Sequence, residues 1–241
     1  MKVMSVVMTH GPRSKAVFKI AARIRSFTIP SDVFIWNNGP YDLVVPEARV
    51  VNGVNDWGEV QKLTLPLVLD EYDVFFYCDD DTTVHRLFLE NAVRILGAHE
   101  NFLVCAGGSV IEGDDPGRRR WIPSSSFPPK PFYADFADLS CFVMLRPNVE
   151  RMLRYGAMNS QPWNTDLFFS ASYWENGGVI YVPEQPTLSR RCVQMSTAHR
   201  TGLCSGPGFA EQRNKAIREL AARGWRRKPQ LIPAAAPLFW S

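Results

Sequence analysis

Three consecutive carboxylates, Asp79, Asp80 and Asp81, follow directly on the apolar run 74–78. Two Asp residues spaced D-x-D can place their oxygens around one hard cation, and Mg²⁺ or Mn²⁺ held in this way also binds substrate phosphates. A bound cation would offset the repulsion among three adjacent negative charges. The alternative is structural, because Asp also favours the N-terminus of a following helix. The triplet alone leaves both interpretations open.

The segments that must position this triplet alternate between short β-rich runs and helix-period stretches, as in βαβ units. The run 73–78 is apolar on both faces, which is typical of a central strand in a parallel sheet covered by helices. We therefore predict an α/β fold, a Rossmann-like and mostly parallel sheet flanked by helices. Strands are predicted at 3–10, 32–40, 48–52, 73–78, 102–108, 139–147 and 179–183, and helices at 14–27, 59–72, 87–100, 148–156, 164–177 and 210–224.

Two features interrupt this alternation. Pro66 should kink the helix 59–72 or end it early, because proline lacks the N–H that a helix interior uses. Residues 112–131 are rich in Gly, Pro and Ser, which predicts a long surface loop. This loop and the segment 190–208 could close over a bound substrate and exclude water.

In open parallel sheets, ligands bind beyond the carboxyl ends of the strands. The predicted strand ends supply hydrogen-bonding groups, cations and the acidic triplet, which together suit a nucleotide with a metal. Arg13 and Lys62 are the cations best placed to meet a pyrophosphate, although both could be solvated helix charges. The polar residues that we expect at this edge, besides the triplet, are Thr9, His10, Gly11, Arg13, Asn37, Asn38 and Gly39.

A strand ending in "WNNGP", then a helix, then an apolar strand running into "DDD" resembles the nucleotide-sugar-binding half of GT-A type glycosyltransferases. The resemblance implies that the D-x-D motif holds a divalent metal bridging the two phosphates of the donor. The implied ligands lie among Asp79, Asp80 and Asp81, with Asp81 as the first choice for direct contact. It also implies that Asn37 and Asn38 lie near the base, although a strand-end Asn could equally cap a turn.

The second half of the chain resembles the same family more loosely. The stretch "DFADLSCFVMLRP" resembles its acceptor-side strand segment, "WNTDLFF" its acidic residue at the start of a helix, and "STAHRTG" its late metal-binding His. The resemblance implies acceptor-side Asp138, a general base at Asp166 and a metal ligand at His199. Many members have Glu-Asp where this chain has Thr165 and Asp166, so the base rests on one carboxylate. The helix macrodipole would also favour Asp166, and His199 could be a surface residue.

The resemblance implies transfer of a sugar from a nucleotide-diphosphate donor, UDP in the first instance, to a hydroxyl of a glycan, lipid or protein. The expected cofactor is Mn²⁺ or Mg²⁺. Inversion is the favoured stereochemistry, and retention, in which Asp166 would only orient the sugar, is left open. Residues 1–111 would form the donor-binding half, 112–225 a smaller acceptor-side half with lid loops, and 226–241 a C-terminal tail, all within one compact domain. Trp121, Trp163 and Trp174 are candidates to stack on an acceptor sugar, although each could instead be an ordinary core or surface residue.

Other templates compete for the same residues. "FFYCDDDTT" satisfies the first motif of haloacid-dehalogenase-type phosphatases, with Asp79 as nucleophile and Asp81 as acid and base. That family needs a Lys before a later acidic pair, and no Lys occurs between Asp81 and Asp114. A sugar-phosphate nucleotidyltransferase would share metal and nucleotide, but "THGPRSK" only faintly matches its Gly-rich basic loop. A calcium-dependent carbohydrate-binding module would not need the βαβ frame.

Composition narrows the class of protein further. The chain of 241 residues has 27 Lys and Arg against 24 Asp and Glu, a formal charge of +3, which is too small to argue for a nucleic-acid partner. The short run Arg118–Arg120 suits a solvated loop, or a contact for phosphate or an anionic acceptor. Five cysteines without a C-x-x-C pair suggest a reducing compartment. With no segment long enough to span a bilayer, we expect a cytoplasmic protein, or one peripheral to a membrane.

Overall fold

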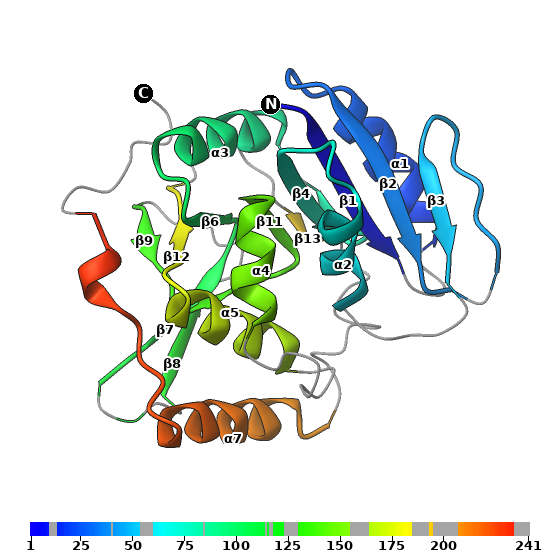
Figure 1. The fold of residues 1–241 in the computed structure, drawn as a ribbon. Helices are drawn as coiled ribbons and strands as arrows, with labels where there is room; N and C mark the ends of the chain where they lie inside the picture. Colours follow the sequence, from blue (N-terminus) through cyan, green and yellow to red (C-terminus); the bar gives the residue numbers. More distant parts are fainter. Residues whose placement is uncertain are drawn as a thin grey trace.

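The described residues form a mixed eight-stranded sheet in the order β3-β2-β1-β4-β11-β6-β12-β9 (Figure 1). β3, β2, β1 and β4 run parallel, β11 is antiparallel to both β4 and β6, β12 is parallel to β6, and β9 is antiparallel to β12. The strands are β1 Val3–Thr9, β2 Ser31–Asn37, β3 Arg49–Asn52, β4 Val74–Asp79, β6 Phe102–Cys105, β9 Phe132–Tyr133, β11 Cys141–Leu145 and β12 Val179–Val182.

The computed structural model describes residues 1–9, 14–39, 41–53, 60–83, 85–113, 115, 118–122, 130–154, 164–184, 193–194 and 207–233. Figure 1 shows α3 and α7 at opposite ends of the molecule. Within the described ranges, no helix is both long and apolar enough to cross a membrane. The helices are α1 Ser14–Arg25, α2 Val60–Val68, α3 Arg86–Ala98, α4 Pro147–Leu153, α5 Thr165–Glu175, α7 Phe209–Ala222 and the 3₁₀ helix η7 Pro229–Leu231.

β4 is the strand on which the acidic triplet depends, and it lies in the middle of the sheet. Its residues from Val74 to Cys78 are at most 2% exposed, as the apolar run on both faces predicts. The Tyr77 ring stacks on Phe142 of β11 with a centroid distance of 4.4 Å. This burial makes the end of β4 a rigid position from which carboxylates can project.

The predicted α/β fold is confirmed, with corrections in its second half. The single strand predicted at 102–108 is two strands, β6 and β7 Gly108–Ile111, and the predicted loop 112–131 contains β8 Arg119–Ile122. β7 leaves the main sheet and pairs with β8 and with β10 Phe136–Ala137. A Cβ at Gly108 would lie 2.7 Å from the Ala134 Cβ, so this crossing needs glycine. α2 ends at Val68, two residues after Pro66, as expected.

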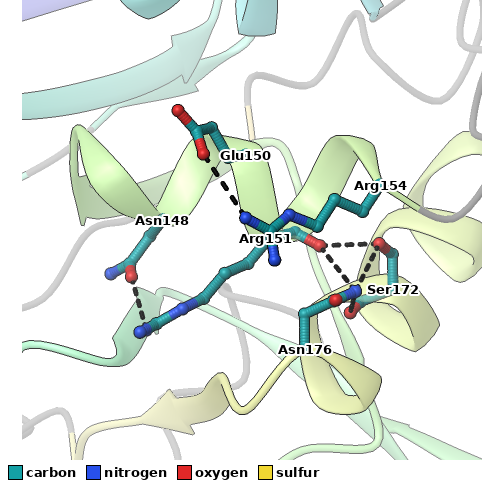
Figure 2. Close-up of polar contacts among 6 residues, drawn as sticks. All are labelled: Asn148, Glu150, Arg151, Arg154, Ser172 and Asn176. Carbon is teal, nitrogen blue, oxygen red and sulfur yellow. Dashed lines mark hydrogen bonds and ion pairs between the residues drawn. The ribbon is translucent and has the colours of Figure 1, made fainter.

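A polar clamp joins α4 to α5 and thereby fixes the helix that carries Asp166 (Figure 2). The Ser172 hydroxyl donates to the Arg151 carbonyl at 2.6 Å, and the Arg151 guanidinium donates to Asn148 Oδ1 at 2.8 Å. The Asn148 amide in turn donates to the carbonyls of Glu100, at 2.8 Å, and Phe102, at 3.2 Å. The buried Asn148 therefore ties α4 to the start of β6.

We predict that Asn148→Ala lowers the free energy of unfolding by about 2–4 kcal/mol, because it leaves two carbonyls without their donor in a buried position. Arg154→Ala is the matched control on the same helix. Its ion pair with Glu150 spans 3.6 Å between side chains that are 63% and 65% exposed, so its loss should cost less than about 0.5 kcal/mol. Urea unfolding of both variants measures the difference, and equal losses would contradict the clamp.

Candidate functional site

The carboxyl ends of β1, β2 and β4 meet at one edge of the sheet, and their register sorts the polar side chains onto two faces. Met8 lies opposite both Trp36 and Asp79, so these three side chains share one face. Thr9 lies opposite Asn37, and both point to the other face. Successive side chains of a strand alternate between faces, so neighbours in sequence here have different surroundings.

On the Thr9 face, the middle carboxylate of the triplet is bonded within the protein. The Thr9 hydroxyl donates to Asp80 Oδ2 at 2.6 Å, and both residues are 1% exposed. The Asp80 N–H donates to the Met8 carbonyl at 3.1 Å, which continues the pairing of β4 with β1 beyond Asp79. Asp80 therefore holds the two strand ends together.

Asn37 shapes the turn after β2. Its side-chain nitrogen donates to the Tyr41 carbonyl at 2.7 Å and to Asn52 Oδ1 at 2.8 Å, while its oxygen accepts from the Gly39 N–H at 2.9 Å. The residue is 1% exposed. The sequence allowed Asn37 either to lie near a nucleotide base or to cap a turn, and these contacts are those of a turn.

On the Met8 face, the buried atoms Trp36 Nε1 and Asn38 Oδ1 have no hydrogen-bond partner among the described residues, and neither does Tyr77 Oη deeper in the sheet. The Asn38 amide nitrogen contacts Met8 Sδ at 3.7 Å. A Cβ placed on Gly53 would lie 3.4 Å from Trp36 Nε1 and 3.4 Å from Asn38 Oδ1, so both border the space next to this glycine. An unsatisfied buried polar group costs about 1–3 kcal/mol, and a ligand supplying the partners would remove that cost.

Sequence reasoning missed Trp36 and Gly53. Trp36 stands inside an apolar strand, where a Trp reads as core, and Gly53 follows a short strand as an ordinary turn residue would. The alternation of side chains along a strand could have identified Trp36, because it is two residues before Asn38 and therefore lies on the same face of the sheet.

Asp79 and Asp81 are the two triplet carboxylates other than the one bound by Thr9. Asp79 is half-buried on the Met8 face, and its N–H donates to the Ser140 carbonyl at 2.9 Å. Asp81 is 8% exposed, and its Oδ1 accepts from the Thr82 hydroxyl at 3.3 Å. Carboxylate oxygens suit Mg²⁺ or Mn²⁺, and two of them with substrate phosphates and water are a usual donor set. No group of three or more His, Cys, Asp or Glu in the described ranges could hold a metal by itself.

Several predicted site residues lie outside the described residues: His10, Arg13 and His199. Lys62 belongs to α2, but its side chain is likewise outside them. The chain does return to the acidic triplet ahead of His199. β13 Val193–Gln194 pairs with β5 Thr82–Thr83, and Gln194 lies opposite Thr82. His199 follows five residues later, and its role as a metal ligand stays a prediction.

Asp138 lies in the turn that leads into β11, next to the end of β4. Its Oδ1 accepts from the Ser140 N–H at 3.0 Å, and its own N–H donates to the Gly107 carbonyl at 3.1 Å. Burial, with the added charge of Asp138, raises the pKa of the Cys105 thiol well above its ordinary value, so this cysteine stays protonated. The acceptor-side role of Asp138 stays a prediction.

Asp166 is the second residue of α5, and both of its oxygens accept from one arginine of α7. Arg213 Nη1 donates to Asp166 Oδ1 at 2.7 Å, and Nη2 donates to Oδ2. The Arg213 side chain is 7% exposed and the Asp166 side chain is 16% exposed. Sequence analysis predicted the helix of Arg213 but could not show which of its residues faces α5. The role of Asp166 as a base stays a prediction.

The three candidate tryptophans differ in position. Trp174 is fully buried, and its Nε1 donates to the Ala134 carbonyl at 3.1 Å, so of the alternatives given for it the core position is the observed one. Trp121 in β8 is 44% exposed. Trp163 lies outside the described part of the chain.

Comparison with known proteins gives a fold. No protein-family model and no curated protein matches the chain. Among solved structures, it is similar to GalNAc-T7 in complex with UDP, GalNAc and Mn²⁺, with a TM-score of 0.57 and 10% sequence identity. The match covers 76% of this chain and 41% of that one, so this chain spans about two fifths of the neighbour's length. At this identity the likeness shows the fold alone, which is similar to the GT-A glycosyltransferase fold.

We predict that Thr9→Val lowers the free energy of unfolding by about 2–3 kcal/mol. Valine has nearly the shape of threonine but removes the hydroxyl that donates to the buried Asp80 carboxylate. Ser5→Ala in the same strand is the control, because it removes only a hydroxyl pair with Ser31 at 2.7 Å, which should cost about 1 kcal/mol. Calorimetric melting measures both, and a Thr9→Val protein as stable as the parent would contradict the assigned bond.

Proposed function

We propose that this protein is a glycosyltransferase that moves a sugar from a nucleotide-diphosphate donor, UDP in the first instance, to a hydroxyl acceptor. The observation that carries the proposal is the pair of unpaired polar atoms, Trp36 Nε1 and Asn38 Oδ1, on the same face as Asp79 at the carboxyl edge of the sheet. In open α/β sheets this edge is where ligands bind. The fold likeness to a glycosyltransferase supports the same conclusion.

The nucleotide base would occupy the space next to Gly53. Trp36 supplies a donor and Asn38 an acceptor there, or a donor if its amide is turned, since O and N are assigned from the surrounding network. A uracil base has both acceptor carbonyls and a ring N–H, so it can supply a partner to both atoms. The absence of a Cβ at Gly53 leaves room for the ring to approach the backbone.

Asp79 and Asp81 would hold a divalent cation, Mn²⁺ or Mg²⁺, and His199 would join them. Once bound, this cation supplies neutralisation of the negative charge that develops on the departing diphosphate. Asp80 contributes indirectly, because its bond to Thr9 keeps the end of β4 against β1. The predicted contacts of His10, Arg13 and Lys62 with the donor remain part of the proposal.

Asp166 would take the proton from the acceptor hydroxyl, which is the role of a base in an inverting transfer. Its pairing with Arg213 is compatible with this role, because each carboxylate oxygen has a second lone-pair position beside the one that accepts from the guanidinium. The pairing also fixes the orientation of the carboxylate, and a fixed orientation is what a positioned base needs.

We predict that UDP binds in the presence of Mn²⁺, and that Asp79→Ala weakens this binding at least about tenfold, because even indirect supports of a metal site contribute about 10–100-fold. Isothermal titration calorimetry with UDP, with Mn²⁺ or with EDTA, measures the effect. Asp73→Ala is the matched control, since Asp73 is exposed just before the amino end of β4 and its carboxylate accepts from the Lys2 N–H at 2.7 Å, away from the carboxyl edge of the sheet.

Two results would overturn the proposal. One is UDP binding of equal strength with Mn²⁺, with EDTA and in Asp79→Ala. The other is phosphate release from simple phosphomonoesters that disappears in Asp79→Asn, because that dependence would identify Asp79 as a phosphatase nucleophile.

A further inference from the structure

Arg119 of β8 is a second arginine whose charge interacts with that of Asp166, and it forms no ion pair with a described carboxylate. Its Nη1 is buried and has no hydrogen-bond partner among the described residues. Buried guanidinium groups are normally paired with a carboxylate, a phosphate or carbonyl oxygens. A donor left in this state is a position where an anionic ligand would be stabilised.

Two described charges act on Arg119. Arg213 is a second cation, and Asp166 is a carboxylate of opposite sign. The pKa of Arg119 is lowered to about 10, mainly by desolvation and then by the charge of Arg213, while the charge of Asp166 offsets part of this. Both Asp166 oxygens accept from Arg213, and no described carboxylate forms an ion pair with Arg119, so an anionic ligand would give its charge a direct partner.

The start of α5 presents a second unpaired group. Asn164, the residue before α5, is 5% exposed, makes no capping bond, and its Oδ1 has no partner among the described residues. α5 has 11 residues, so its first N–H groups carry the partial positive charge of a helix N-terminus. An unpaired cation and an unpaired amide oxygen thus accompany Asp166, one suited to an anion and the other to a hydroxyl.

We propose that Arg119, aided by the charge of Arg213, binds an anionic group of the acceptor, and that Asn164 accepts from one of its hydroxyls. The acceptor class is a sugar that carries a carboxylate or a phosphate monoester. Trp121 lies two residues after Arg119, on the same side of β8, and its 44% exposed ring can stack on a sugar. The assignment of the bound anion to the acceptor rests on the proposed glycosyl transfer, whereas the anion site itself does not.

Arg120 provides a control within the same strand. Its side chain alternates to the opposite side of β8 and reaches Glu112 at 3.4 Å, with both side chains well exposed. Arg119→Gln and Arg120→Gln therefore remove one positive charge each from adjacent positions, and only the first changes the proposed subsite.

The experiment titrates the parent and both variants with glucuronate, glucose 6-phosphate and neutral glucose, by calorimetry or by NMR shifts. We expect at least one of the two anionic sugars to bind to the parent protein. Arg120→Gln should bind this sugar as tightly as the parent does, and both proteins should bind glucose at least about tenfold more weakly than the anionic sugar. Arg119→Gln should weaken the binding of the anionic sugar by about ten- to hundredfold, as for the loss of a charge-assisted hydrogen bond. The stronger of the two anionic sugars identifies carboxylate or phosphate as the group recognised.

Three outcomes would overturn the subsite: equal effects of the two variants, glucose binding as tightly as the anionic sugars, or no binding of either anionic sugar. Melting temperatures control for folding, because a purely structural Arg119 predicts a lower value in Arg119→Gln, whereas an unpaired charge predicts an equal or higher one. UDP binding is measured on the same samples. Loss of UDP binding in every sample, with anionic-sugar binding dependent on Arg119, would reject the glycosyl transfer and keep the anion site.

Discussion

The parallel register of β1, β2 and β4 is the constraint on which the candidate site depends. Because Met8 lies opposite both Trp36 and Asp79, residues one step further along each strand project to the other face. The Thr9–Asp80 hydrogen bond then fixes that second face as structural. A slip of one residue in this register would exchange the two faces and direct Asp80 instead of Asp79 toward the site.

Unsatisfied buried polar groups occur at both ends of the proposed reaction, as they also do at other buried positions such as Tyr77 Oη and Trp225 Nε1. At the donor side these are Trp36 Nε1 and Asn38 Oδ1, and at the acceptor side they are Arg119 Nη1 and Asn164 Oδ1, each without a partner among the described residues. Each lowers the stability of the free protein unless a ligand completes it. Scaffold residues such as Asn37, in contrast, have their hydrogen bonds made by the protein.

The fold and the acidic strand end could be predicted from the sequence, because apolar runs and helical spacing act locally. The continuous apolar run before Asp79 identified β4, and Pro66 gave the early end of α2. The pairing of Asp166 with Arg213 could not be predicted, because it joins residues 47 positions apart on two helices. β8 was missed for a similar reason: among the described strands it is an edge strand that pairs only with β7, the middle strand of a separate three-stranded sheet, and two of its four residues are arginines.

The central claim is that Asp79 and Asp81 bind the metal while Asp80 holds the strands. A crystal structure with UDP and Mn²⁺, with anomalous diffraction recorded to locate manganese, tests this claim most directly. The account predicts a manganese peak in contact with carboxylate oxygens of Asp79 or Asp81, a uracil ring next to Gly53, and an intact Thr9–Asp80 bond. A peak bound by Asp80 with the Thr9 bond broken, or UDP bound away from this edge of the sheet, would contradict it.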